Sequence, residues 1–568
     1  MSDKKISKQF HWLLPFLIVC ITAICFYPSL TNANFVNWDD DRYLLNNIAK
    51  LTAPITAFFT QPFVDNYMPL TAISWVVNYK LNGLNPFGYH FVNLILHLLN
   101  TVLVYILVKK ITANNLKMAV FVALFFAISP LRAESVAWAT GRKDVLYMAF
   151  FLSGLLTWWQ YIGSNHRKYY IYTLLFFVAA LMSKPAAIVF PLILPLLEYL
   201  TPRCPILKGR ALIEKLPFVG LAVLFGVITW QIQAGQAIGN WGQFSAVQKI
   251  SFTCYALLQY GVNMLIPFKT AALHPYPVFD AQTNLPFYYY AAIPVAVLVF
   301  GLFLYWAYKN VWIRLALGIY IAGFLLVLPV WQVGNAIMAD RYTYLSAIGL
   351  GLGLAWWLFS DKSQAQRAAA NRWPKLVTAL LGLWFFVSGW LTVEATQRWQ
   401  NSELLWTHAI DLYPQGHFLA YNKRGEVFYE AGKFDRALAD YEAAIKAQPK
   451  HYLGYAGRGQ VLLNAKKFDQ ALPDFNQAIS LNPQSAATYN SRGHLYYQTQ
   501  QFEAALADYS KAIALDPTYY RAFNNRAIIY HTQGNKAAAL ADYDQALKLK
   551  PNYTNAKINR QKLLEQTP

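Results

Sequence analysis

Three adjacent carboxylates, Asp39, Asp40 and Asp41, are the residues of this sequence best suited to chemistry. They stand in the stretch "FVNWDDDRY", directly after an apolar run that reads as a membrane span. Like charges this close repel each other, and neighbouring lipid disfavours their charged forms. An ordinary loop has no need of such a cluster at the end of a span, so we expect Asp39 and Asp40 to be functional.

Further charged residues recur in the polar stretches between apolar runs. They are Arg132, Glu134, Arg142, Lys143 and Asp144 in "SPLRAESVAWATGRKD", Lys184 in "MSKPAA", and Asp340 and Arg341 in "MADRYTYL". A carboxylate can take the proton of an attacking hydroxyl, while Arg and Lys bind and neutralise a phosphate that leaves. A lipid-linked phosphosugar supplies such a leaving group. Alone, Lys143 or Asp144 reads as a loop ion pair or an interface residue.

The composition places most of these residues in a membrane protein. Of 568 residues, 56% are hydrophobic, 16% are aromatic and 13% are charged, and the formal net charge is +20. Soluble domains carry about 25% charged residues. The four cysteines lie in the apolar part, so they predict no disulfide framework. The apolar N-terminal run has no obvious cleavage site, and we interpret it as a retained span.

Twelve charge-poor apolar stretches are long enough, or nearly so, to cross a bilayer. They lie near 13–30, 90–108, 118–131, 145–163, 169–183, 185–197, 216–233, 251–267, 287–308, 315–335, 343–360 and 376–393. Basic residues cluster in alternate connections, which the positive-inside rule places in the cytoplasm. These clusters lie around residues 4–8, 109–117, 167–168, 203–215, 309–314 and 362–375. A span at 251–267 would break the alternation, so we predict a re-entrant or interfacial helix there and about eleven spans.

A 34-residue period begins at residue 418. Pro449, Pro483, Pro517 and Pro551 are 34 apart, as are Tyr441, Phe475, Tyr509 and Tyr543. Small residues that let paired helices approach, aromatics between them and a terminating proline resemble the tetratricopeptide repeat. We expect four repeats (418–451, 452–485, 486–519 and 520–553), a capping helix at 554–568, and a linker with a half-repeat at 399–417. Asn422, Asn490 and Asn524 share one repeat position, either as peptide-binding amides or as a solvated polar column.

The assembled motifs resemble the transmembrane and tetratricopeptide repeat containing proteins and, more broadly, the GT-C class of polyprenyl-phosphate-sugar-dependent glycosyltransferases. The strings that carry the likeness include "NWDDDRYL", "ISPLRAESVAWATGRKDVLYMAFFL", "LMSKPAAIVFPLILPLLEY" and "ADRYTYLSAIGLGL", followed by the repeats. The resemblance implies a polytopic bundle whose first outward loop supplies the catalytic acid, which corresponds to Asp39 or Asp40. Glu134 would assist, and Arg132, Arg142, Lys184 and Arg341 are candidates for the lipid phosphate.

These observations predict an all-α protein, a membrane domain over 1–398 followed by the repeat solenoid. The expected function is transfer of a sugar from a polyprenyl phosphate carrier to an extracytoplasmic hydroxyl, with inversion. Animal relatives imply mannose and protein O-glycosylation, and the compact array is similar to that of a bacterial relative in the inner membrane, with the repeats outside. The expected partners are the lipid-linked donor and a protein acceptor, with no nucleic acid.

Two alternatives are a non-catalytic membrane scaffold that gathers partners through its repeats and a lipid transporter, which would need more charges within its spans. No cofactor is certain and no metal is indicated. His90 and His97 are two helical turns apart, but such histidines are more often packed in a core than bound to a metal.

Overall fold

The structure is a computed structural model of the chain. It describes residues 2–31, 34–64, 66–201, 209–233, 244–277, 285–330, 336–360, 374–414 and 418–565. The chain divides into two compact units, Met1–Leu412 and Tyr413–Pro568. The division falls within the segment predicted as a linker and half-repeat, and the helix of that segment, α19 (Ser402–Leu412), belongs to the first unit.

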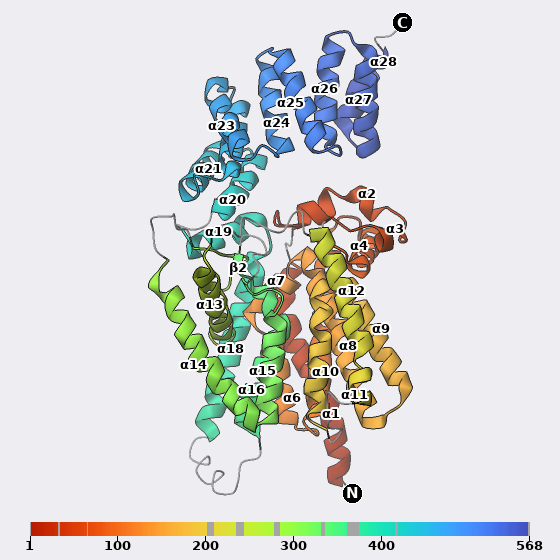
Figure 1. Cartoon of the computed structure of the whole chain (residues 1–568), viewed down its shortest axis with the longest axis vertical. Coiled ribbons are helices and arrows are strands. Elements are labelled where there is room, and N and C mark those ends of the chain that lie inside the picture. Colours follow the sequence, from red (N-terminus) through yellow and green to blue (C-terminus); the bar gives the residue numbers. More distant parts are fainter. Residues whose placement is uncertain are drawn as a thin grey trace. The chain divides into compact units, whose positions relative to one another are not determined.

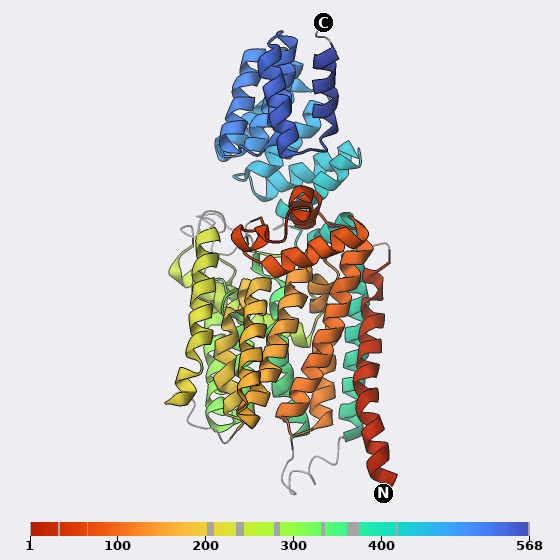
Figure 2. The same cartoon turned by 90° about the vertical axis from the view of Figure 1, so that its right-hand side faces the viewer.

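The first unit is a bundle of helices, as Figures 1 and 2 show. Its main helices are α1 (Ser2–Phe26), α4 (Pro69–Asn82), α5 (Pro86–Ile111), α6 (Leu116–Ala127), α8 (Arg142–Ser164), α9 (Arg167–Ser183), α10 (Phe190–Glu198), α12 (Leu216–Gln233), α13 (Ala246–Leu265), α14 (Phe287–Lys309), α15 (Val311–Phe324), α16 (Thr343–Phe359) and α18 (Pro374–Arg398). Short elements α2 (Ile48–Leu51), α3 (Ala57–Thr60), α7 (Ala133–Val136) and β2 (Ala336–Met338) gather with α4 at the end of this unit opposite the N terminus.

The helices match the predicted membrane fold. Within the described residues, seven helices are long and apolar enough to cross a membrane, or eight if the bent pair Leu116–Ala127 and Pro130–Val136 is one span. The other apolar stretches expected to span also form helices, but shorter ones: α9, α10 and α15. The chain is an integral membrane protein, and helix length alone supports seven or eight of the eleven expected spans.

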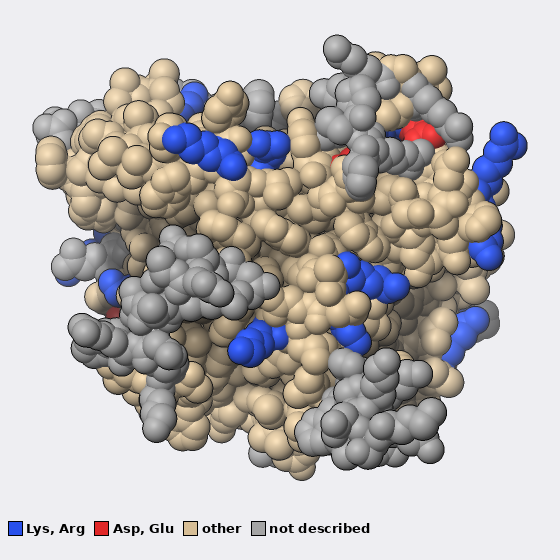
Figure 3. Space-filling model, turned by 90° about the horizontal axis from the view of Figure 1, so that it is seen from below, with Lys and Arg blue, Asp and Glu red and all other residues tan. Residues whose placement is uncertain are grey.

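Local signals fix the helix ends at the basic end of the bundle. The side chain of Asn115 caps α6 by accepting from the N–H of Met118 at 3.2 Å, and Asn310 caps α15 in the same way. Lys109 and Lys110 stand in the last turn of α5, where cations interact favourably with the helix dipole. Figure 3 views this end and shows Lys and Arg at several places on it. Residues 202–208 and 361–373, which hold other predicted basic clusters, lie outside the described residues.

Helix α13 dips into the first unit and does not pass through it. Phe244 precedes α13 and Tyr276 follows it, yet their rings stack with centroids 5.6 Å apart. The chain therefore leaves and returns at one end, as expected of a re-entrant helix at 251–267. The return brings β1 (His274–Pro275) into antiparallel pairing with β2. Helices α13, α14, α15 and α16 also border an apolar groove with a volume of about 1070 Å³.

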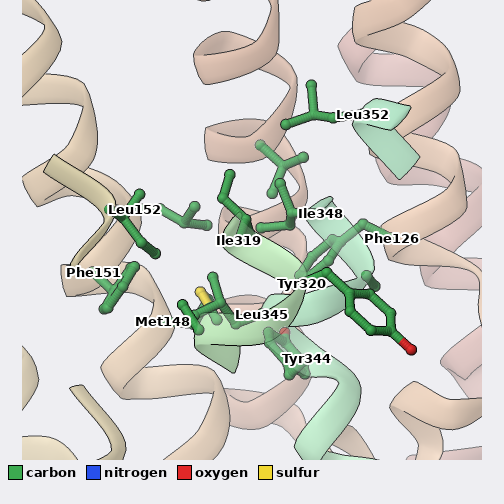
Figure 4. Close-up of a cluster of buried hydrophobic side chains, with 14 of the residues drawn as sticks. Phe126, Met148, Phe151, Leu152, Ile319, Tyr320, Tyr344, Leu345, Ile348 and Leu352 are labelled. Atoms are coloured by element: carbon green, nitrogen blue, oxygen red, sulfur yellow. The ribbon is translucent and has the colours of Figure 1, made fainter. Parts of the chain in front are cut away.

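The core of the bundle is formed mainly by α6, α8, α15 and α16, and Figure 4 shows part of it. Labelled members include Phe126, Phe151, Ile319, Tyr344 and Leu352. Helices α15 and α16 pack closely because α16 carries Gly349: a methyl group there would lie 2.5 Å from the carbonyl oxygen of Ala316. Small residues at such crossings are typical of membrane helices, which gain stability from close van der Waals contact.

The second unit is a series of antiparallel helix pairs (Figure 1). The pairs are α20 (Phe418–Glu430) with α21 (Phe434–Ala447), α22 (Tyr452–Asn464) with α23 (Phe468–Leu481), α24 (Ala486–Gln498) with α25 (Phe502–Leu515), and α26 (Tyr520–Thr532) with α27 (Lys536–Leu549), followed by α28 (Thr554–Glu565). The first helices of the pairs begin where the predicted repeats begin. The predicted fold class, a helical membrane bundle followed by a repeat solenoid, is confirmed.

Candidate active site

Asp40 is held inside the protein. Its side chain is fully buried, and its two carboxylate oxygens accept from the N–H groups of Val36 and Thr140, both at 3.0 Å. Burial raises the pKa of Asp40 to about 7. These bonds join the first loop to the loop before α8, and burial keeps the oxygens of Asp40 from solvent.

Asp39 points the other way. Its side chain is 32% exposed, and its Oδ2 lies 3.8 Å from the Nζ of Lys143, the second residue of α8. Asp41 accepts from the N–H of its neighbour Arg42 at 2.8 Å. Of the three adjacent carboxylates, Asp39 therefore combines access to solvent with a cation from another element.

Glu134 and Arg341 form a second pair. Glu134, on α7, is 2% exposed and forms an ion pair with the guanidinium of Arg341, which is 17% exposed. The Oε2 of Glu134 also accepts from the backbone N–H of Arg341 at 2.7 Å. This double contact joins α7 to the short turn η7 (Asp340–Tyr342), far apart in sequence.

Asp144 and Lys184 form a third pair of the same kind. Asp144 is 1% exposed, and the Lys184 ammonium that pairs with it is 18% exposed. Lys143 lies close enough to Asp144, Lys184 and Arg341 for each charge to act on it electrostatically. The predicted cations Lys184 and Arg341 thus share one cluster with Asp39 and Glu134.

Trp138, which sequence reasoning did not single out, lies between two of these cations. The Nζ of Lys143 is 4.7 Å from the centroid of its ring, and the guanidinium of Arg341 is 5.8 Å from it. Cation–π contacts of this kind hold a positive group without neutralising it. The sequence feature that could have indicated Trp138 is its place between charged residues in "ESVAWATGRKD".

Arg132 lies deeper. It is fully buried, donates from Nη2 to the hydroxyl of Thr343 at 2.5 Å, and lies over the ring of Tyr344 at 5.2 Å. Within the described part of the chain, its Nε and Nη1 have no hydrogen-bond partner, and neither does the Oδ2 of Asp144. Buried polar atoms are normally satisfied, so a polar ligand or water is expected beside Arg132.

Arg142 does not fit the phosphate role predicted for it. It is buried, and its donors reach four neutral acceptors: Asn93 Oδ1 at 2.5 Å, Asn78 Oδ1 at 2.8 Å, the carbonyl of Tyr89 at 3.0 Å and Ser74 Oγ at 3.3 Å. These contacts join α4, α5 and α8. Arg142 therefore organises the bundle, and its donors are not available to a phosphate.

Asp340 and His274 form a fourth pair, and both of its side chains are buried. The Oδ1 of Asp340 lies 3.0 Å from the Nε2 of His274, and its Oδ2 accepts from the N–H of Ala271 at 3.0 Å. Asp340 and Glu134 line a small, partly open cavity of about 10 Å³, room for about one water. Sequence reasoning missed His274 because its partner is 66 residues away.

Of the two spaced histidines, His97 is bonded within the helix bundle. His97 is buried, with Nδ1 2.6 Å from the Tyr344 hydroxyl and Nε2 3.0 Å from the carbonyl of Ala127. Across the described ranges, no group of three or more His, Cys, Asp or Glu side chains is arranged to hold a metal ion.

The repeat asparagines contact their own array. Asn490 accepts from the amide of Asn525 at 3.0 Å, Asn524 accepts from the amide of Asn559 at 3.3 Å, and Asn422 donates to the carbonyl of Phe418 at 3.0 Å. The predicted peptide-binding amides of Asn490 and Asn524 are thus engaged between neighbouring helix pairs, so peptide binding by them stays a prediction.

A second column in the repeats escaped sequence reasoning. In each repeat an arginine forms two hydrogen bonds, at 2.7–2.9 Å, with the aspartate 16 residues later; the pairs are Arg424–Asp440, Arg458–Asp474, Arg492–Asp508 and Arg526–Asp542. Both partners recur every 34 residues. The period that revealed the prolines could therefore have revealed these pairs.

Family models for the tetratricopeptide repeat match residues 422–486 and 520–553, and a TPR repeat model matches 493–534. Part of the chain is 31% identical to the protein O-mannosyl-transferase Tmtc1 of Drosophila melanogaster, over 32% of this chain and 22% of that protein. Part is 34% identical to human TMTC1, over 25% of this chain and 17% of that one. The chain is TMTC-like and contains tetratricopeptide repeats. It spans about a fifth of the length of these curated relatives.

Solved structures match at the level of the repeats. One is YrrB, described as a TPR protein with an unusual peptide-binding site, at 22% identity, covering 28% of this chain and 81% of that one with a TM-score of 0.24. Another is the thermophilic TPR protein TTC0263 of Thermus thermophilus, at 20% identity, covering 34% of this chain and 96% of that one with a TM-score of 0.27.

Proposed function

We propose that this TMTC-like protein is a membrane glycosyltransferase that moves mannose from a polyprenyl phosphate carrier to a protein hydroxyl outside the cytoplasm. The donor and the inverting GT-C mechanism extend what the matched relatives are named for, protein O-mannosyl transfer. The single observation that carries the proposal is the exposed Asp39 carboxylate beside Lys143, within a cluster of acid–base pairs.

The three pairs differ in which partner reaches solvent. In Glu134–Arg341 and Asp144–Lys184 the carboxylate is buried and the cation is partly exposed, whereas in Asp39–Lys143 the carboxylate is the more exposed partner. Asp39 is thus suited to meet a substrate hydroxyl, and the cations are suited to meet an anion. A general base must first lie within reach of its proton, so geometry favours Asp39 over the buried Asp40.

In the proposed reaction, Asp39 accepts the proton of a serine or threonine hydroxyl. The hydroxyl oxygen forms a bond to the anomeric carbon from the face opposite the phosphate, and the bond from that carbon to the phosphate oxygen breaks. The polyprenyl phosphate leaves with the electron pair, stabilised by Lys143, Lys184 and Arg341. The product glycoside has the inverted anomeric configuration.

Glu134 has a supporting role in this scheme. Its carboxylate is buried and paired, so it holds Arg341 toward the phosphate instead of touching the acceptor. Arg132 sits below the cluster with two unsatisfied donors, and we propose that it binds a phosphate oxygen directly or through water.

The orientation follows from charge. The basic residues at the end of the bundle where α1 begins favour the cytoplasmic side for that end, so the site faces outward. We place the protein in a bacterial inner membrane, with the repeats outside the cytoplasm and binding the acceptor protein. The names of the matched relatives support a protein acceptor.

The test uses the purified full-length protein, polyprenyl-phosphate [³H]mannose and a library of Ser/Thr peptides. Asp39→Asn keeps the side-chain size and removes the base, and transfer should fall about 10²–10⁴-fold. Asp435→Asn, at an exposed position of α21, is the matched control and should retain full transfer. Wild-type activity in Asp39→Asn would refute the proposal, and absence of transfer by the wild type would favour the scaffold alternative.

A further inference from the structure

Helix α19 (Ser402–Leu412) lies against the loop that carries Asp39. The N–H of Asn37 donates to Ser402 Oγ at 2.9 Å, and the indole N–H of Trp406 donates to the Oδ1 of Asn37 at 2.6 Å. Trp38 and Trp406 meet edge to face with ring centroids 5.3 Å apart. Trp406 is fully buried, so it packs against this loop like a core residue.

The chain just before α19 anchors the start of the same loop. The N–H of Asn34 donates to the carbonyl of Gln400 at 2.9 Å. The side-chain amide of Gln400 in turn donates to the carbonyls of Pro28 and Thr31, at 3.2 and 3.0 Å. Residues 400–406 thus bond the chain before Asp39 at four positions: Pro28, Thr31, Asn34 and Asn37.

Asp39 is therefore fixed from two sides. Its predecessor Trp38 is packed on α19, and its successor Asp40 is bonded to the N–H of Thr140. Among the described residues, the Asp39 side chain forms an ion pair with Lys143, at 3.8 Å. Its position depends on these two neighbours.

The same helix also borders the second acid of the site. Leu405 and His408 line the cavity of about 10 Å³ that Glu134 and Asp340 share. The Nε2 of His408 lies 2.9 Å from the carbonyl of Thr270, which fixes α19 to the segment before β1. One short helix thus contacts the surroundings of both Asp39 and Glu134.

We propose that α19 is part of the active-site framework and that Trp406 is a positioning residue for Asp39. The inference rests on the proposed function, and it assigns a role to a segment that reads in sequence as a linker. A carboxylate displaced by about 1 Å can cost on the order of 10²-fold in rate. Loss of Trp406 should therefore lower kcat and leave the KM for the lipid-linked donor unchanged, because the hydrogen bond and ring contact that Trp406 makes among the described residues go to Asn37 and Trp38 and not to a phosphate-binding cation.

The first experiment needs no catalytic activity. In full-length protein whose four native cysteines are replaced by serine, Asp39→Cys is labelled with an anionic, water-soluble methanethiosulfonate. Adding Trp406→Ala should raise the labelling rate several-fold, and Trp406→Phe, which keeps the ring and loses the N–H, should raise it less. An unchanged rate in Trp406→Ala would overturn the inference.

The second experiment measures transfer with polyprenyl-phosphate [³H]mannose and the peptide library. Trp406→Phe and Asn37→Ala each remove the same hydrogen bond, so their effects on kcat should be similar and their combination little worse than either alone. Additive losses, or a loss confined to the donor KM, would contradict a positioning role.

The matched control is Trp158→Phe. Trp158 is also fully buried, packs on Phe218, and lies 16 residues, about 24 Å, along α8 from Arg142. It should change neither the labelling rate nor kcat. If the wild type shows no transfer, the proposed function fails, but the labelling experiment still decides whether α19 holds the loop.

Discussion

The carboxylate of Asp40 accepts a hydrogen bond from the backbone N–H of Thr140, a residue one hundred positions further along the chain. This bond joins the first loop to the loop that leads into α8. Asp39, the residue before Asp40, is 32% exposed and lies beside Lys143. Contacts of this kind between distant segments affect both the stability of the protein and the proposed activity.

The stability of the protein should depend on the protonation of Asp40. Its pKa is about 7 in the folded protein and near 3.8 when exposed. Between these values the unfolded chain has released the proton and the folded chain retains it. The free energy of unfolding should therefore fall as pH rises from 4 to 7, by on the order of 4 kcal/mol, and level off above pH 7. Thermal unfolding in detergent at pH 4.5–7.5 measures this.

The control for that experiment is Asp40→Asn, which cannot titrate. The difference in melting temperature between wild type and variant should shrink or reverse as the pH rises. A constant difference across the range would show that Asp40 does not titrate in this window.

Breaking the Glu134–Arg341 pair should have unequal effects. Arg341→Met leaves the 2% exposed Glu134 without its partner and should cost about 3–5 kcal/mol. Glu134→Gln leaves Arg341, which is 17% exposed and lies 4.8 Å from the ring centroid of Tyr342, so its cost should be about 1–3 kcal/mol. Thermal unfolding of the two single variants and the double variant tests this order, and a larger loss for Glu134→Gln would contradict it.

The arginine–aspartate pairs should stabilise the repeat array. Asp508→Asn removes the charge from a carboxylate that is 7% exposed and bonds Arg492 twice, so we expect a loss of about 1–3 kcal/mol. Urea unfolding of residues 413–568, followed by circular dichroism, measures it. Asp516→Asn should cost less, because the exposed Asp516 side chain accepts from the N–H and the hydroxyl of Thr518 in its own turn and not from an arginine among the described residues.

Close packing of α15 on α16 should tolerate no methyl group at Gly349. A Cβ there would lie 2.5 Å from the carbonyl oxygen of Ala316, so Gly349→Ala must push the helices apart. Gly353→Ala, one turn further on, would place its methyl 3.4 Å from the Cβ of Ala316, which the packing can accommodate. Gly349→Ala should lower the melting temperature by several degrees more than Gly353→Ala.

The sequence predicted the elements well because each depends on local pattern. Apolar runs gave the helices, and the 34-residue period gave the repeat boundaries. Contacts between loops far apart in sequence could not be predicted in this way. Asp39 and Asp40 are equivalent in sequence, and the bonds from the N–H groups of Val36 and Thr140 distinguish the buried carboxylate from the exposed one.

Arg132 and Arg142 show the same limit. Both stand in one short stretch and both are buried, yet Arg142 meets four acceptors from α4 and α5, whereas Arg132 has two unsatisfied donors. Which acceptors surround a guanidinium depends on how the helices cross. The sequence therefore predicted a cluster of charges, and the folded loops decide which of its members can act.

The arginines of the repeats also reach backward. Arg492 donates to Asn476 at 2.7 Å and Arg526 to Ser510 at 3.1 Å, each in the preceding repeat, and Arg560 of α28 pairs with Asp544 at 2.6 Å. These three junctions are thus built from the same two positions. Deleting one 34-residue repeat would bring equivalent positions of two repeats together. The array can therefore be shortened or lengthened by whole repeats and keep the same kind of contact between neighbours.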